Sequence, residues 1–80
     1  MLITYDDLAD VLYIIFKKSI SDETSIDDNF VIVRRLSNEI ISLTIDGFNA
    51  RIKEGSWDDS HILKYKDDLN IKELDKFKKG

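Results

Sequence analysis

Two acidic residues near the start of the chain have a spacing that could support chemistry. Asp6 and Asp10 are four residues apart, and a pair of carboxylates can bind a metal ion or carry out acid–base catalysis. A metal ion needs a third or fourth converging ligand, and neither a histidine nor a cysteine lies near this pair. Asp side chains commonly accept hydrogen bonds from backbone N–H groups in turns. Asp6 and Asp10 are therefore predicted to be structural turn caps.

The other residues that could carry chemistry do not form a catalytic or ligand-binding pattern. His61 is the only histidine, and a continuous Asp59-Ser60-His61 run cannot place acid, base and nucleophile in a catalytic triad. Asp27-Asp28 and Asp67-Asp68 do not have the spacing of a calcium loop, and we interpret them as solvated loop acids. None of the three glycines lies in a phosphate-binding loop. We predict no catalytic, cofactor-binding or metal-binding residue and no enzyme activity.

The length of 80 residues predicts a single domain, residues 1–80, with no room for a second hydrophobic core. The chain has no cysteine, which excludes disulfides and thiolate chemistry. Small domains that lack disulfides and metals often gain buried surface by forming oligomers. No basic segment followed by a long apolar run is present. We therefore expect neither a signal peptide nor a membrane partner, and we predict a cytoplasmic location.

Negative charge is concentrated in the first part of the chain. Residues 1–30 contain seven acids and two lysines, a net charge of −5, whereas the whole chain has a net charge of −4. Binding to phosphates requires clustered cations, so we expect no nucleic-acid partner. Lys76, Lys78 and Lys79 are interpreted as a solvated chain end. The acidic balance makes a small basic protein a candidate partner.

The hydrophobic pattern predicts four strands. They span residues 2–5, 11–17, 30–36 and 40–45, with a polar loop at residues 18–29. The links at residues 6–10 and 37–39 are too short for a parallel crossover, so antiparallel pairing is expected. Asn38 can adopt the positive φ that a tight hairpin turn requires. Gly47 marks the end of the fourth strand or a bulge.

The C-terminal part is predicted to be helical. Ser56 followed by acids resembles a capping box and predicts a helix over residues 57–66, although the alternation of apolar and polar residues from His61 onward would also suit a strand. Asn70 and Glu73 form a second capping box, which predicts a helix over residues 71–78. The predicted fold class is α+β: a four-stranded antiparallel β-meander with one or two C-terminal helices packed on the sheet.

The opening residues resemble a known family. The pattern Tyr-Asp-x-x-x-Asp-x-Leu-Tyr-Ile at residues 5–14 is similar to the start of a small prokaryotic family, domain of unknown function 2283. The resemblance covers roughly residues 2–48 and implies a small antiparallel β-meander, with residues 49–80 as a C-terminal extension outside it. The family's usual Asp-Gly turn and Gly-Ile-Glu strand are replaced by Asn38 and by Ser42-Leu43-Thr44. A role for that Glu therefore does not carry over, and the resemblance implies no activity.

Alternation along the strands predicts which side chains form the core. In a strand, successive side chains point to opposite faces of the sheet. A sheet covered by a C-terminal helix needs one buried face. The expected core residues are Leu12, Ile14, Phe16, Val31 or Ile32, Ile41, Leu43 and Ile45.

The opposite face is also apolar, and it carries the candidate interface residues Tyr13, Ile15, Phe30 and Ile32. Three alternatives are open: residues 49–80 cover both faces, a second copy covers this face, or a different partner binds it. We predict a homodimer. The predicted function is that of a small cytoplasmic, non-enzymatic protein-interaction module, antitoxin-like or regulatory by analogy. The alternative is a small enzyme or ligand-binding domain that uses the Asp6/Asp10 turn.

Overall fold

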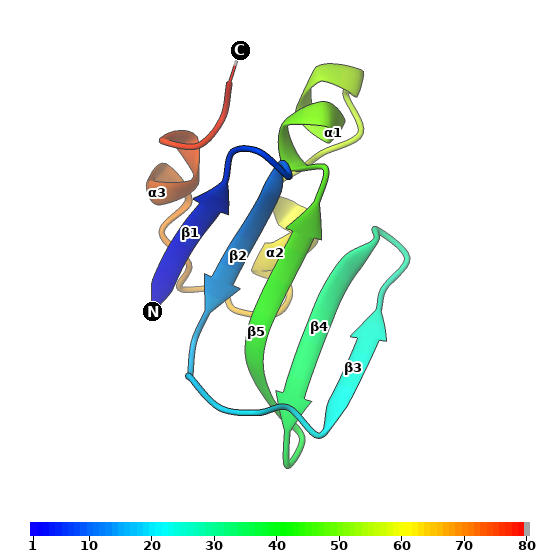
Figure 1. Cartoon of the computed structure of the whole chain (residues 1–80), viewed down its shortest axis with the longest axis vertical. Helices are drawn as coiled ribbons and strands as arrows, with labels where there is room; N and C mark the ends of the chain where they lie inside the picture. Colours follow the sequence, from blue (N-terminus) through cyan, green and yellow to red (C-terminus); the bar gives the residue numbers. More distant parts are fainter. Residues whose placement is uncertain (80) are drawn as a thin grey trace.

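The computed structural model of the chain describes residues 1–79, which form one antiparallel sheet and three short helices (Figure 1). This confirms the α+β class, but the sheet has five strands rather than the four that were predicted. The helices number three rather than one or two within the described residues. In chain order the elements are β1 (Leu2–Asp6), β2 (Val11–Ile15), β3 (Glu23–Ile26), β4 (Val31–Leu36), β5 (Glu39–Asp46), α1 (Phe48–Glu54), α2 (Ser60–Leu63) and α3 (Ile71–Asp75).

The strand order is β1-β2-β5-β4-β3, so the predicted meander is wrong. In a meander β2 would pair with the next strand along the chain, but it pairs with β5, with Leu12 opposite Ile45. The segment after β2 crosses the lower ends of β5 and β4 to the far edge of the sheet, where β3 begins (Figure 1). The physical reason lies in burial. The long, apolar β5 occupies the centre of the sheet, and the short β3, whose side chains are all exposed, occupies an edge.

β3 lies within the segment that the sequence predicted to be a loop. Its residues Glu23–Ile26 are polar apart from the last, so they carry no strand-like alternation. They pair antiparallel with β4, with Ser25 opposite Val33. Backbone pairing with an apolar neighbour therefore forms this strand, rather than the burial of its own side chains.

The predicted hairpin turn after β4 is confirmed. Ser37 and Asn38 have φ angles of 51° and 69°, and Leu36 pairs with Glu39 across the turn. Two successive left-handed residues match the twist of a two-residue hairpin. A register shift between Arg34 and Arg35 then interrupts the ladder with β5.

The predicted C-terminal helix starts where expected and ends early. The Asn70 side chain accepts a hydrogen bond from the Lys72 N–H and caps α3, which ends at Asp75 rather than at residue 78. The predicted helix over residues 57–66 is reduced to α2, and its N-cap is Asp59. Ser56 is not a cap, because its hydroxyl donates to the Arg51 carbonyl near the end of α1. α1 itself was not predicted.

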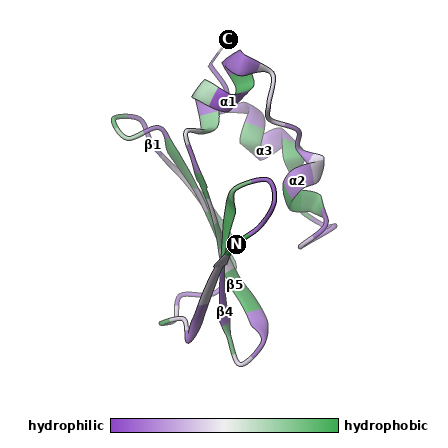
Figure 2. Ribbon diagram, turned by 90° about the vertical axis from the view of Figure 1, so that its right-hand side faces the viewer, coloured by the Kyte–Doolittle hydropathy of each residue, from purple (hydrophilic) through white to green (hydrophobic). Residues whose placement is uncertain are grey.

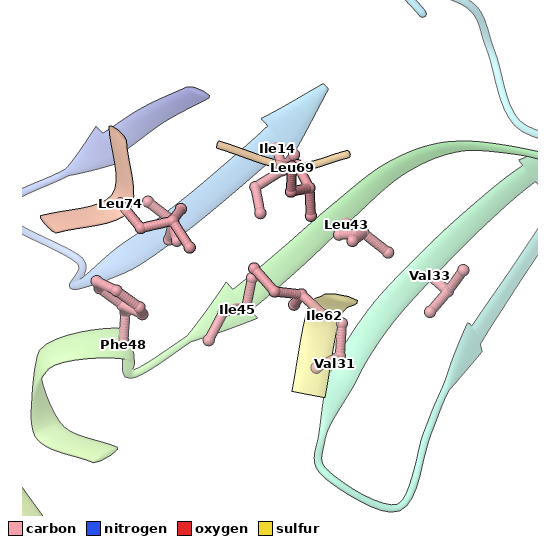
Figure 3. Packing of buried hydrophobic residues seen from close by; sticks show 10 residues of the cluster. Ile14, Val31, Val33, Leu43, Ile45, Phe48, Ile62, Leu69 and Leu74 are labelled. Carbon is pink, nitrogen blue, oxygen red and sulfur yellow. The ribbon is translucent and has the colours of Figure 1, made fainter. Parts of the chain in front are cut away.

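All three helices lie on one face of the sheet (Figure 2). Phe48, Ile62, Leu69 and Leu74 pack there against strand side chains (Figure 3). The buried apolar residues are Leu12, Ile14, Val31, Val33, Ile41, Leu43, Ile45, Phe48, Ile62, Leu69 and Leu74. The predicted core is therefore largely confirmed, with Val31 rather than Ile32 buried and Phe16 only partly buried. Residues 49–79 do not cover both faces.

Candidate functional site

Asp6 is the last residue of β1, and its side chain accepts two hydrogen bonds from the β1–β2 turn. One carboxylate oxygen receives the backbone N–H groups of Leu8 and Ala9, each at 3.1 Å. Both bonds are exposed to solvent. This is the geometry of an Asp turn cap, which satisfies local backbone donors.

Asp10 was predicted to cap its own turn, but its side chain caps the start of α1. Its carboxylate accepts the backbone N–H groups of Asn49, at 2.8 Å, and Ala50, at 3.0 Å. Its own carbonyl oxygen accepts the N–H groups of Gly47 and Phe48. These are the N–H groups at the start of α1, which have no partner within a helix. Asp10 therefore caps a helix about forty residues further along the chain, because Gly47 occupies the N-cap position and has no side chain.

A hydrogen-bond network extends from Asp10 to the C-terminal segment. The Tyr5 hydroxyl donates to the Asp10 carboxylate at 2.6 Å. The Asn49 side-chain amide donates to the Tyr5 hydroxyl and to the Phe77 carbonyl, each at 2.9 Å, and its oxygen accepts the Lys79 N–H. The network joins β1, the first turn, α1 and the segment after α3.

The network also shifts the pKa of its acidic group. Burial acts to raise the pKa of the Asp10 carboxyl, but hydrogen bonds from Tyr5, Asn49 and Ala50 outweigh burial, so the pKa lies below its ordinary value. The same contact raises the pKa of the Tyr5 phenol. A carboxylate with three donors on its two oxygens is a structural acceptor. Within residues 1–79 no group of three or more His, Cys, Asp or Glu side chains could hold a metal ion.

Asp27 has a similar structural role, which corrects its interpretation as a solvated loop acid. One of its oxygens accepts the N–H groups of Asn29, at 2.8 Å, and Val31, at 2.9 Å. The other accepts the Tyr65 hydroxyl and lies 3.3 Å from the Lys64 amine. Burial, followed by the bond to Asp27, raises the pKa of Tyr65 to about 12. Burial acts to raise the pKa of Asp27 as well, but its donors lower it overall.

His61 does not complete a catalytic group. It lines a hollow of about 350 Å³ together with Ser56, Asp28 and Glu54. Its Nδ1 atom is buried and has no hydrogen-bond partner within residues 1–79, so no acid orients the ring as a triad requires. The imidazole lies edge-on to Trp57, with ring centroids 5.5 Å apart. This contact gives it a packing role.

The face of the sheet opposite the helices carries the candidate interface residues. We call this the open face. Across its middle the strands align in the order Thr4, Tyr13, Thr44, Ile32 and Ile26. Of these, Tyr13 is 37% exposed and Ile26 is 65% exposed. A second row contains Leu2, Ile15 and Arg34, and Arg34 donates to the Thr44 hydroxyl at 2.8 Å.

Phe30 extends the open face beyond the start of β4. It is 69% exposed and, with Ile26 and Ile32, lines a hollow of about 340 Å³. Its backbone has a φ of 60°, a conformation that is strained for a bulky residue. Arg51 holds this turn by donating to the carbonyl oxygens of Asn29, at 2.9 Å, and Phe30, at 3.1 Å.

The two ends of the open face carry opposite charges. Asp6 and Asp46 lie in the same cross-strand row at one end. At the other end Lys17, Lys18 and Arg34 line a groove of about 470 Å³, which also contains the exposed Ile20. The first end also holds the Arg51 guanidinium, which lines the hollow beside Asp46. The face is therefore an apolar strip with an acidic end, where two carboxylates outnumber one arginine, and a basic end.

Comparison of this chain with protein families, curated proteins and solved structures finds no match. Among residues 1–79 there is no helix with the length and hydrophobicity needed to cross a membrane. The geometry of the open face alone therefore makes it the candidate site.

Proposed function

We propose that the protein is a non-enzymatic protein-interaction module that forms a homodimer through the open face. The single observation that carries this proposal is the apolar strip around Tyr13, Ile32 and Phe30, on the face of the sheet opposite the helices. An exposed apolar patch on a small domain is typical of an interaction site. The sheet has only one face covered by helices, so a second layer on the other face would complete a sandwich.

The backbone at Phe30 supports this role. A left-handed φ disfavours a bulky residue by about 1–2 kcal/mol, yet the chain places an aromatic ring there and leaves 69% of it exposed. Strained positions often coincide with binding sites, where the partner rather than the monomer gains from the side chain. Aromatic side chains are also enriched at the energetic centre of protein interfaces.

The carboxylates favour this proposal over an enzyme or ligand-binding domain built on the Asp6/Asp10 turn. Both Asp10 oxygens accept hydrogen bonds from Tyr5 and the start of α1. A metal ion or substrate proton at this position would have to displace those donors and uncap a helix. An antitoxin-like or regulatory role, and the resemblance to domain of unknown function 2283, remain part of the proposal as analogies.

The oligomeric state in solution tests the proposal. The wild type is expected to sediment as a dimer at high concentration and to dissociate on dilution. Ile32→Lys should shift it to the monomer, because the lysine ammonium would have to be buried in the apolar strip. Leu8→Lys is the matched control, since Leu8 is fully exposed in the β1–β2 turn, away from the strip. A wild type that stays monomeric at millimolar concentration would overturn the proposal.

A further inference from the structure

We infer that two open faces pack with their strands running in opposite directions, so that the basic end of each copy contacts the acidic end of the other and each Ile20 enters the hollow beside Phe30. This packing depends on the proposed homodimer and specifies how its two copies are oriented. The molecule that covers the open face is a second copy of the chain.

Charge decides between the two symmetric ways to pack these faces. A two-fold axis parallel to the strands would place Asp46 against Asp46 of the other copy, and lysines against lysines. An axis that runs across the strands places Asp46 against the groove formed by Lys17 and Lys18. Like charges that face each other across an interface disfavour the complex, and opposite charges steer and orient it. The second axis is therefore favoured.

The shapes of the two ends are also complementary. Ile20 is 91% exposed at the basic end, in the segment that crosses the lower ends of β5 and β4 (Figure 1). The hollow at the acidic end is lined by three apolar side chains, Ile26, Phe30 and Ile32, and at its rim by Asp46, Gly47 and Arg51. The axis across the strands brings the crossing segment of one copy over this hollow in the other. The Ile20 side chain is thus paired twice in the dimer with the apolar side of this hollow, formed by Ile26, Phe30 and Ile32.

The size of the face sets the expected strength of the dimer. A sheet of five strands spaced ~4.8 Å apart and roughly 17 Å long presents roughly 400 Å² in projection. Each partner of a standard interface buries ~800 Å². Side-chain relief, the β3–β4 turn and the crossing segment add contact area. The interface falls at the low end of the size range, so we expect a reversible dimer whose population follows protein concentration.

Neutralising one charge distinguishes the two axes. The Asp46 side chain is exposed, so Asp46→Asn should leave the fold unchanged. With strands opposed, it should raise the dimer dissociation constant about fivefold, since two symmetry-related contacts are weakened. Added salt should weaken the wild-type dimer for the same reason. With like ends together, both changes would instead tighten the dimer.

Two further variants test the remaining contacts. Asp46→Lys alone should weaken the dimer more than Asp46→Asn, and adding Lys17→Glu and Lys18→Glu to the same chain should restore it. Ile20→Ala should raise the dissociation constant about tenfold because two apolar contacts are lost, whereas Leu8→Ala should not. The readout is analytical ultracentrifugation, with thermal denaturation as the check on folding.

The outcomes separate the two proposals. A monomeric wild type overturns the self-association and the packing together. A dimeric wild type that Asp46→Asn leaves unchanged or tightens, or that the triple charge reversal fails to restore, overturns the packing and leaves the open-face homodimer standing.

Discussion

Replacing Asp10 with alanine should destabilise the protein far more than the loss of a local turn cap. The carboxylate accepts two N–H groups at the start of α1 and the Tyr5 hydroxyl. Loss of a helix N-cap costs about 1 kcal/mol, with a range of about 0.5–2, and the phenolic hydrogen bond contributes about 1 kcal/mol. Asp10 also has a φ of 56°, a left-handed conformation that disfavours alanine by about 1 kcal/mol or more.

The expected loss is therefore about 3 kcal/mol in the free energy of unfolding. A domain of this length has a total stability of about 4–12 kcal/mol, so the variant should be marginal. Its midpoint of thermal unfolding should fall by about 10–20 °C. Urea denaturation followed by circular dichroism gives both the free energy and the m-value. An unchanged m-value would show that the native state is weakened without becoming less compact.

Two matched variants separate the contributions to this loss. Asp10→Asn retains one acceptor oxygen and tolerates a left-handed φ, so it should lose only about 1 kcal/mol. Asp6→Ala removes two solvent-exposed bonds within a turn and should also lose about 1 kcal/mol or less. If Asp10→Ala cost no more than Asp6→Ala, Asp10 would not be holding α1 on the sheet.

Three further results are expected. The free energy of unfolding should fall as the pH drops below about 4. The pKa values of Asp10 and Asp27 are lowered in the folded protein, so the unfolded chain binds protons first. Replacing both residues with asparagine should flatten the dependence of the urea midpoint on pH, and an unaltered dependence would contradict the role of these groups. Tyr65→Phe should lower the free energy of unfolding by about 1 kcal/mol and remove the tyrosine that titrates with a pKa of about 12 in alkaline absorbance, whereas Tyr13→Phe should leave that titration in place. Asn38→Gly should be nearly neutral, whereas Asn38→Val should lose about 1–2 kcal/mol at the positive φ of the hairpin turn; equal stabilities would argue against a left-handed turn.

Local patterns in the sequence predicted the parts of the fold that are held locally. The strands around Leu12 and Leu43 follow from alternation, because each strand buries every second side chain. The turn at Asn38 and the start of α3 at Asn70 follow from residue types with specific backbone roles. The strand order could not be predicted in the same way, since pairing of β2 with β5 depends on segments distant in the chain.

α1 was missed because its N-terminal cap is not local. The N-cap position is Gly47, which has no side chain to accept a hydrogen bond. The Asp10 carboxylate accepts the N–H group of Asn49 in its place. One signal was available. Gly47 and Gly55 both have positive φ and bracket the seven residues Phe48–Glu54, most of which favour helices. A glycine at each end of a helix-forming run indicates a short helix even without a recognisable N-cap.

The acidic first part of the chain is a weaker sign of a basic partner than its charge suggests. Of the seven acids in residues 1–30, six have partners within the chain itself. Asp6, Asp10 and Asp27 cap backbone N–H groups of turns or of α1. Asp22 accepts the Ser37 N–H. Glu23 contacts Arg35, and Asp7 contacts Lys79. These carboxylates keep their negative charge, but a basic partner that bonded directly to their oxygens would have to displace the existing donors. Asp46 is exposed on the open face, in the same cross-strand row as Asp6, and lines the hollow beside Phe30. Asp6 and Asp46 place negative charge at one end of that face, opposite its own basic groove, and a second copy can match both ends at once.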